Sequence, residues 1–367
     1  MTTCAVESLD ILRVREDFPA LKEVVYLNVG TYGIMPEPAL RATLEMVAEF
    51  ERFGFASKGD LGGKAQRTRE RLAALLGVAP EEVALTNHAS DGNNLALGAL
   101  EWQPGDEIIS TNEEHPSLDS PLKWLEKHKG VVVHRLAVSP DPEVMRSRLE
   151  AAYNPRTRLV AMSHVSCCTG TRLPAREITA WAKARGILSH FDGAQALGVF
   201  PLDVREIGCD FYTSNGHKWL LGPKGTGVFY APRAWLERMV LGALEAGTRA
   251  WGLAAGLGAS LDWYEGLGWE NVRAHIARLS AYLKERVLER PYLHLHTPLP
   301  FESSSGMTSF TVAGHEAGEV ANRLREGWNI YVRVVPEFNA VRISTAVFND
   351  EGDIDRLIEA LETISQE

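Results

Sequence analysis

Residues 187–218 read ILSHFDGAQALGVFPLDVREIGCDFYTSNGHK, and this stretch sets the expectation for the fold. It contains two short apolar strand candidates, ILSHFD (187–192) and DFYTSN (210–215), about one strand-and-helix unit apart. Asp192 ends the first candidate strand, and Lys218 follows the second, 26 positions after Asp192. Because the tips of neighbouring strands face a common crevice, we expect Asp192 and Lys218 to lie at one site.

The same alternation of apolar strands and amphipathic helical stretches extends from about residue 80 to residue 232. The other strand candidates are EVALTN (82–87), DEIIST (106–111), VVVHRLAV (131–138), RLVAMSHV (158–165) and GTGVFYA (225–231). This pattern predicts an α/β fold with a mainly parallel, seven-stranded sheet that is covered by helices. Such sheets bind ligands beyond the carboxyl ends of their strands, which makes the polar residues there the first candidates for chemistry.

The chain changes character after about residue 250. A helical pattern runs from about residue 253 to residue 290, and the strand candidates GMTSFTVA (306–313), IYVRVV (330–335) and VRISTAVF (341–348) follow it. Further helices are expected near residues 315–326 and from about residue 350. We therefore predict a large domain at 16–250 and a smaller C-terminal α/β domain at 251–367. Residues 1–15 are expected to belong to the smaller domain.

Composition narrows the possible partners. The chain has 367 residues, 45% of them hydrophobic, and a formal charge of -10, which argues against nucleic acid or an anionic membrane as the main partner. No apolar run approaches 18 residues, and the N-terminus has no basic and apolar leader pattern, so we expect a cytoplasmic protein. The four cysteines, Cys4, Cys167, Cys168 and Cys209, suit reduced thiols, and no spacing predicts a metal site.

Lys218 lies in a turn of small and polar residues, TSNGHKWLLGPKGTG (213–227), and not on an amphipathic helix face. A buried or cation-flanked lysine loses its proton more easily and can attack an aldehyde, as Schiff-base lysines do. The alternative is an ordinary surface lysine, and Lys224 in the same segment is a rival candidate.

Three further segments could serve a cofactor. The carboxylate of Asp192 could keep a ring nitrogen protonated, although a helix N-cap is the alternative role. TNHASDGNNLALGAL (86–100) follows a strand and opens a helix, so the backbone N–H groups near Ala89 and Ser90 could hold a phosphate, or Ser90 could simply be an N-cap. His115 directly follows a strand and precedes a proline, and could lie across a flat ring. The chain has neither a dinucleotide fingerprint nor a P-loop.

Taken in order, these motifs and several others resemble the class V aminotransferase family over essentially the whole chain. The set is A-S-D-G-N-N (89–94), E-H-P-S (114–117), T-G-T (169–171), D-G-A-Q (192–195), S-N-G-H-K (214–218), G-P-K-G-T-G (222–227), G-T (247–248) and V-R-I-S (341–344). This family includes cysteine desulfurases, selenocysteine lyases and isopenicillin N epimerases.

The resemblance implies a fold type I enzyme that carries pyridoxal 5'-phosphate (PLP) as a Schiff base on Lys218. It assigns Asp192 to the ring nitrogen, Gln195 to the ring hydroxyl and His115 to stacking on the ring. The phosphate contacts that it implies are Ala89, Ser90, Ser214 and His217, with Thr248 reaching the phosphate of the partner subunit in a homodimer. Arg342 would bind the substrate carboxylate, and Asn28, in NVGTYGIM (28–35), would help to form the substrate pocket.

The chain also departs from the family pattern. Cysteine desulfurases carry a catalytic cysteine between the strands that match IYVRVV and VRIS, but here the connection is only PEFNA (336–340). Cys167 and Cys168 stand in HVSCCTGTRLP (164–174), where desulfurases tend to have asparagine, and we expect both to border the ring pocket. The segment 231–246 is shorter than in most relatives.

The resulting prediction is a PLP-dependent enzyme that acts at the α-carbon of an amino-acid substrate, as an aminotransferase or an epimerase. A carbon–sulfur lyase or a desulfurase-like lyase is the alternative. A low-turnover PLP-binding regulatory protein is an alternative of another class, and the absent glycine fingerprint disfavours a nicotinamide-dependent oxidoreductase.

Overall fold

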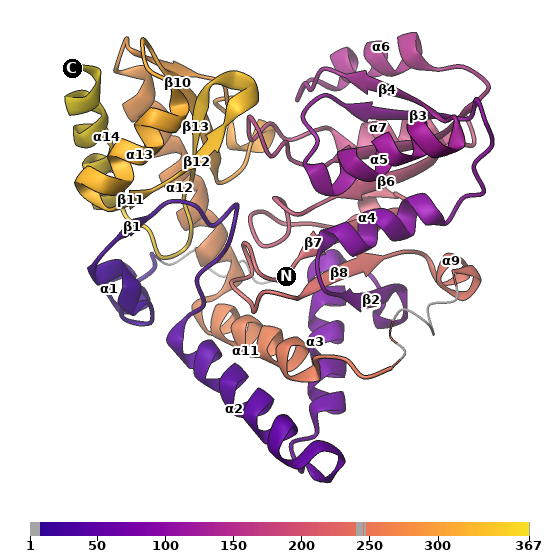
Figure 1. Cartoon of the computed structure of the whole chain (residues 1–367), viewed down its shortest axis with the longest axis horizontal. Coiled ribbons are helices and arrows are strands. Elements are labelled where there is room, and N and C mark those ends of the chain that lie inside the picture. The colour runs from indigo at the N-terminus through magenta and orange to yellow at the C-terminus, as the bar shows by residue number, and fades with distance from the viewer. Residues whose placement is uncertain (1–7, 240–244, 246, 367) are drawn as a thin grey trace.

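The computed structural model describes residues 8–239, 245 and 247–366, and its centre is a seven-stranded sheet (Figure 1). The strands are β2 (Val83–Thr86), β3 (Glu107–Thr111), β4 (Val132–Leu136), β5 (Thr157–Ser163), β6 (Leu188–Asp192), β7 (Phe211–Asn215) and β8 (Gly227–Tyr230). Their order is β2-β8-β7-β6-β5-β3-β4, and β8 runs in the direction opposite to that of the other six strands. The predicted seven-stranded, mainly parallel sheet is confirmed.

Helices pack on both faces of this sheet (Figure 1). They are α4 (Ala89–Gly98), α5 (Pro116–Lys129), α6 (Pro142–Ala152), α7 (Ala175–Lys183), α8 (Val204–Ile207) and α9 (Arg233–Arg238). Because both faces are covered, the central strands are buried throughout: every residue of β7 and β8 is buried. Side chains therefore reach solvent or a ligand mainly at the ends of these strands.

A second sheet forms the core of the C-terminal part of the chain. It contains β9 (Leu293–Leu295), β10 (Met307–Val312), β12 (Arg333–Val335) and β13 (Ala340–Ser344) in the antiparallel order β12-β13-β10-β9. The helices α12 (Trp269–Leu288), α13 (Ala317–Trp328) and α14 (Glu351–Ser365) pack on it, and their apolar faces share one buried cluster with the strands. The smaller C-terminal α/β unit is thereby confirmed as a fold feature.

The N-terminal segment packs on this smaller unit. α1 (Ile11–Glu16) is tied to α14 through Arg15, whose Nη1 lies 2.8 Å from Oδ2 of Asp353. β1 (Val25–Tyr26) pairs in parallel with β11 (Ile330–Tyr331). Short 3₁₀ turns occupy Pro19–Lys22, Gly54–Ala56, Pro80–Glu82, Phe301–Ser303 and Pro336–Phe338.

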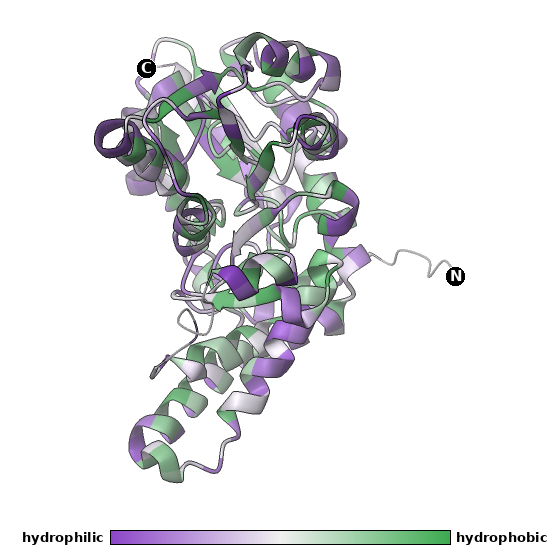
Figure 2. Cartoon of the chain, turned by 90° about the vertical axis from the view of Figure 1, so that its right-hand side faces the viewer, coloured by the Kyte–Doolittle hydropathy of each residue, from purple (hydrophilic) through white to green (hydrophobic). Residues whose placement is uncertain are grey.

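The helices α2 (Glu37–Phe53), α3 (Leu61–Leu76) and α11 (Trp251–Leu267) form an arm that projects from the body of the molecule in both views (Figures 1 and 2). Small residues bring them close: the hydroxyl of Thr68 donates to the Ala254 carbonyl oxygen at 3.0 Å. α11 thus packs on two helices that precede the sheet in the chain. The domain division at residue 250 stays a prediction.

The helical pattern expected from about residue 253 to residue 290 corresponds to two helices, α11 and α12. Gly268 lies between them with a φ of 81°, a conformation that a right-handed helix cannot contain. The apolar periodicity continues on both sides of the break, so periodicity alone does not reveal it.

Candidate functional site

A cavity of about 480 Å³ lies at the carboxyl ends of the central strands, where the two units of the fold meet. The large sheet and its loops supply Ala89, Ser90, His115, Asp192, Gln195, His217 and Lys218 to its wall, and the small sheet supplies Arg342. Eight of the residues predicted from the sequence therefore converge here from segments far apart in the chain. Ser214, Thr248 and Asn28 do not line it.

Lys218 is the lysine that lines this cavity, three residues beyond the end of β7. Only 9% of its surface is exposed. The pKa of its ammonium group is lowered from 10.5 to about 8, chiefly by burial, while the nearby Asp192 carboxylate opposes this and Arg342 adds to it. The rival Lys224 is exposed, lies outside the cavity wall and donates from Nζ to the Gly33 carbonyl oxygen at 2.7 Å.

The depressed pKa of Lys218 predicts how the protein captures an aldehyde at different pH values. Only the neutral amine attacks an aldehyde, so the capture rate should rise with pH up to about 8 and then level off. The measurement is the rate of absorbance change when cofactor-free protein meets PLP, beside a lysine-containing peptide as the control. A rate that keeps rising toward pH 10, as that of the peptide should, would contradict a depressed Lys218 pKa.

The turn that carries Lys218 is packed tightly against Gly33. The backbone N–H of Gly33 donates to the His217 carbonyl oxygen at 2.7 Å, and a Cβ added at Gly33 would lie 2.5 Å from the Lys218 carbonyl oxygen. Two backbones approach too closely here for any side chain, which explains a glycine at this position.

We expect Gly33→Ala to destabilise the protein by about 1–3 kcal/mol, because the backbone around Lys218 must move to relieve the clash. Gly62→Ala is the matched control, since Gly62 is an exposed residue of α3 with nothing near the position of the added Cβ. There the change should stabilise by up to about 1 kcal/mol. Urea denaturation measures both. Equal effects of the two variants would refute the close approach.

Asp192 is held by a chain of buried polar groups. Its Oδ1 accepts from the Ala194 backbone N–H at 2.9 Å, and its Oδ2 accepts from Nδ2 of Asn93 at 2.9 Å. The other end of the Asn93 amide lies 2.8 Å from Nε2 of His190, whose pKa burial lowers to about 4. His190 is therefore neutral near pH 7 and donates from Nε2. Turns, and not an α-helix, follow Asp192, so the N-cap alternative does not apply.

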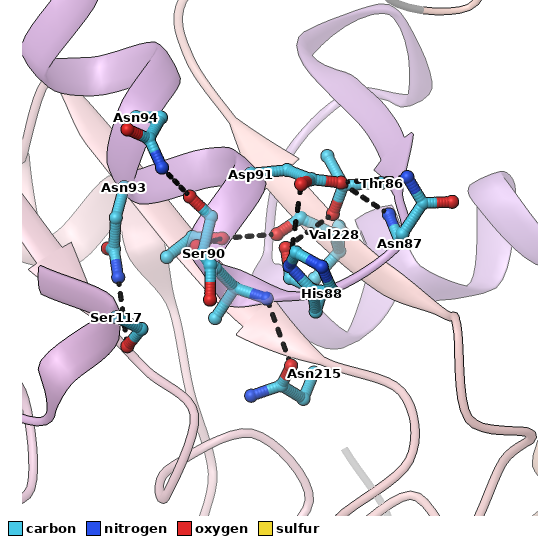
Figure 3. A network of polar contacts seen from close by, with 12 residues as sticks. Thr86, Asn87, His88, Ser90, Asp91, Asn93, Asn94, Ser117, Asn215 and Val228 are labelled. Atoms are coloured by element: carbon cyan, nitrogen blue, oxygen red, sulfur yellow. Dashed lines mark hydrogen bonds and ion pairs between the residues drawn. The ribbon is translucent and has the colours of Figure 1, made fainter. Parts of the chain in front are cut away.

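The N-terminus of α4 meets the end of β7 at the cavity wall (Figure 3). The backbone N–H of Ala89 donates to Oδ1 of Asn215 at 2.9 Å. The Ala89 N–H is therefore already hydrogen-bonded within the protein. Ser90 lies on the wall itself, where the positive end of the helix dipole favours an anion. Ser214 instead donates its hydroxyl to the Gly193 carbonyl oxygen at 2.9 Å, and Asn215, its neighbour, faces the cavity.

Three histidines line the cavity together with Lys218, namely His88, His115 and His217, and the last two lie within range of the Lys218 charge. Burial lowers the pKa of His217 to about 4, and its buried Nδ1 has no hydrogen-bond partner within the described residues. Nδ1 of His115 accepts from the Ser117 backbone N–H at 3.1 Å, which leaves the proton on Nε2. Burial and then Lys218 lower the His115 pKa, so this ring is neutral too.

Arg342 closes the cavity from β13, with only 5% of its surface exposed. Its Nη1 donates to the Cys167 carbonyl oxygen, and its Nη2 donates to the Thr31 hydroxyl at 3.2 Å. Nε is buried and has no partner among the described residues. Asn28 touches this arrangement only through Thr31, whose hydroxyl donates to Oδ1 of Asn28 at 2.7 Å.

The amide of Gln195 is fixed at both ends. Its Oε1 accepts from Nε1 of Trp219 at 2.8 Å, and its Nε2 donates to the Gly30 carbonyl oxygen at 2.8 Å. Thr248 is exposed and outside the cavity wall. Its role toward a partner subunit stays a prediction.

Asn215, Glu114 and Arg333 are among the residues of the cavity wall to which the sequence assigned no role. Burial raises the pKa of the Glu114 carboxyl to about 7, although it accepts hydrogen bonds from Ser163 and Thr111. Arg333 is exposed and lies directly opposite Arg342 in the β12–β13 pair. Strand periodicity could have identified Asn215, since residues 214 and 215 must face opposite sides. The pairing of the two arginines depends on register.

Within the described residues, no group of three or more histidine, cysteine, aspartate or glutamate side chains could hold a metal ion. None of the helices described is long and apolar enough to cross a membrane.

Comparison with known proteins agrees with this architecture. The profile of the family "Aminotransferase class-V" matches residues 44–357. An isopenicillin N epimerase of Amycolatopsis lactamdurans is 31% identical, over 96% of this chain and 98% of that protein. A cysteine desulfurase of Cronobacter sakazakii is 30% identical, over 96% of this chain and 98% of that protein.

Solved structures are similar over the whole fold. A mutant of C-DES with glycine covalently linked to its PLP cofactor has a TM-score of 0.85 at 26% identity, covering 95% of this chain and 98% of that one. The cystine C–S lyase C-DES in complex with its product cysteine persulfide has the same TM-score at 27% identity. The match covers 94% of this chain and 98% of that one. The chain belongs to the aminotransferase class-V family.

Proposed function

We propose that this protein holds PLP covalently on Lys218 and acts at the α-carbon of an amino acid. The observation that carries the proposal is a buried lysine of depressed pKa that shares one cavity with a fixed carboxylate, Asp192, and a buried guanidinium, Arg342. Family membership supports it, as does the PLP in the similar structure of C-DES.

Buried polar atoms of the cavity fit the parts of this cofactor. The unpartnered Nδ1 of His217 and the wall residue Ser90, at the N-terminus of α4, suit a phosphate. Asp192 suits a ring nitrogen that must keep its proton, because Asn93 and Ala194 hold its carboxylate in place. When bound, PLP supplies an aldehyde for Lys218 and a ring that withdraws electrons from the α-carbon of the substrate.

Residues of the chain supply the other roles, which are proton transfer and binding of the substrate carboxylate. Lys218 would hold the cofactor and would also be the base for the α-proton, a role that a pKa near 8 suits at neutral pH. Arg342 offers a buried guanidinium for the substrate carboxylate, a geometry that fixes which α-bond faces Lys218. Glu114, with a pKa of about 7, can hold or release a proton beside His115.

An aminotransferase or an epimerase is the reaction class that we favour. Residues 336–339, which connect β12 to β13, form a 3₁₀ turn and contain no cysteine, so the persulfide chemistry of a cysteine on that connection has no acceptor there. Both favoured reactions begin with removal of the α-proton, for which Lys218 is the base.

A carbon–sulfur lyase is the second candidate, and Arg333 favours it. Two guanidinium groups directly opposite each other on paired strands repel, and neither pairs with a carboxylate within the described residues. An anion that binds both would relieve this repulsion, as an amino acid with a second acidic group would. The similar C-DES is named for cystine, which carries two carboxylates.

A homodimer is part of the proposal. Gly247 and Thr248 are exposed and lie outside the wall of the chain's own cavity, as suits residues that reach the site of a partner subunit. Sedimentation of the purified protein tests it, and a monomer at all concentrations would contradict it.

The test is a panel of amino acids incubated with PLP-loaded protein in heavy water. Deuterium should enter the α-carbon of at least one amino acid if the protein is an aminotransferase or an epimerase, whereas a lyase can consume its substrate without this exchange and is detected by its product. The product then separates the classes: a keto acid with retained carbon chain for an aminotransferase, the opposite enantiomer for an epimerase, and a released thiol or persulfide for a lyase. Covalent PLP with neither exchange into any amino acid nor a product from any of them would contradict the proposal and favour a PLP-binding regulatory protein.

A further inference from the structure

Two adjacent thiols line the cavity, and the proposed function uses neither. Cys167 and Cys168 lie in the turn after β5, with their sulfur atoms 4.0 Å apart, and both belong to the cavity wall together with Lys218 and Arg342. Cys167 is half-buried and Cys168 is 8% exposed. Cys209, by contrast, is buried away from this wall.

The surroundings of the pair distinguish one thiol from the other. The hydrogen bond with Cys168 lowers the pKa of the Cys167 thiol, burial opposes this, and Arg342 and Lys218 lower the pKa further. The same hydrogen bond raises the pKa of Cys168, and burial adds to the rise. Cys167 is therefore the more acidic thiol of the two and Cys168 the less acidic one, as in pairs of an attacking and a resolving cysteine.

Packing alone accounts for the presence of a cysteine at position 168 but not at position 167. This side chain contacts a small apolar cluster with Val335 and Ala340, where cysteine serves as a small apolar residue. Cys167 only borders that cluster, belongs to the wall of the cavity, and has its sulfur 3.8 Å from the Glu113 carbonyl oxygen. A thiol beside two cations on a cavity wall is in the setting of a reactive cysteine.

We propose that Cys167 and Cys168 form a thiol–disulfide exchange site for low-molecular-weight disulfides that enter this cavity. The Cys167 thiolate attacks one sulfur of a disulfide RSSR, so a Cys167–SR bond forms and one RS⁻ leaves. Cys168 then loses its proton and attacks the Cys167 sulfur, which expels the second RS⁻. The dithiol loses two electrons and becomes a Cys167–Cys168 disulfide, and RSSR is reduced to two RSH.

The turn that carries the pair is anchored to both parts of the fold. Arg342 donates to the Cys167 carbonyl oxygen, Ser309 donates its hydroxyl to the Cys168 carbonyl oxygen at 2.7 Å, and Ser166 accepts from the Cys168 backbone N–H at 3.0 Å. Oxidation of the two thiols to a disulfide would therefore change the turn to which Arg342 is hydrogen-bonded.

The test counts thiols released from an aromatic disulfide, dithiobis(nitrobenzoate). All proteins carry Cys4→Ser, so that the thiol at Cys4, outside the described residues, does not contribute. The parent should release two equivalents of thionitrobenzoate and lose the mass of two hydrogen atoms. Cys168→Ser should release one equivalent and keep a nitrobenzoate adduct. Cys167→Ser should react at least about tenfold more slowly than the parent.

Cys209→Ser is the matched control and should behave as the parent does, because this thiol is buried outside the cavity. A parent that keeps adducts on both thiols, that does not react, or that reacts no faster than its Cys167→Ser variant would overturn the proposal. The readout involves sulfur alone. Failure here therefore leaves the PLP proposal intact, and failure of PLP binding leaves this one intact.

Discussion

Lys218→Ala is expected to abolish covalent capture of PLP and to lower α-proton exchange by at least about 10³-fold. The variant removes the amine that the cofactor binds and the base that moves the proton. Reduction with borohydride followed by mass measurement of the intact chain reports capture, and deuterium incorporation reports exchange. Wild-type protein should gain one reduced cofactor per chain, and the variant none.

Folding does not confound this experiment. Within the described residues Nζ of Lys218 makes no hydrogen bond, and its lowered pKa means that burying the charged form costs free energy. Removing the amine should therefore leave the stability equal or slightly higher, as for residues kept for function at the expense of stability. Thermal unfolding of the variant checks this.

Lys224→Ala is the matched control, since Lys224 lies six positions away in the same segment. Its Nζ bonds to the Gly33 carbonyl oxygen outside the cavity wall, so its loss should change stability slightly and leave capture intact. Loss of capture in Lys224→Ala together with retained capture in Lys218→Ala would reverse the assignment of the two lysines.

Strands such as β6 and β7 could be predicted from the sequence because each is a short apolar run that ends in a polar residue. Asp192 and Asn215 end β6 and β7, and the parallel pairing of these strands brings their ends to one edge. The convergence of Asp192 and Lys218 follows from this local pattern together with the rule for parallel sheets. No long-range information was needed.

Other parts of the site depend on contacts that a local pattern does not contain. Asn93 reaches Asp192 from α4 across the sheet, and His190 orients it from β6. Oδ1 of Asn215 accepts a hydrogen bond from the Ala89 backbone N–H, a contact that the motif alone does not show. Arg333 becomes a partner of Arg342 only through the register of β12 and β13. These pairings join residues that are distant in sequence, so the sequence shows the residue types but not the contacts.

Arg342→Met is expected to lower kcat/KM for an amino-acid substrate by roughly 10²- to 10³-fold, mainly through KM, because truncating one partner of a buried charge pair costs about 2–5 kcal/mol. Arg342 is 5% exposed and has an unpartnered Nε, among the described residues, on the wall shared with Lys218. Arg342→Lys should not restore activity, since an ammonium lacks the planar pair of donors. Arg333→Met is the control and should affect monocarboxylic substrates much less, as Arg333 is exposed.

The deciding comparison uses each amino acid beside the amine that lacks only its carboxylate. If Arg342 binds that carboxylate, the wild type should prefer the amino acid strongly, and Arg342→Met should lose most of this preference while the rate with the amine changes little. The variant also loses the bonds from Nη1 and Nη2 to Cys167 and Thr31, so a general loosening of the site is the competing explanation. Loosening lowers the rates with both compounds equally. An unchanged preference in Arg342→Met would therefore assign Arg342 to holding the turn at Cys167 and would leave the carboxylate to Arg333, where Arg333→Met must then show the loss.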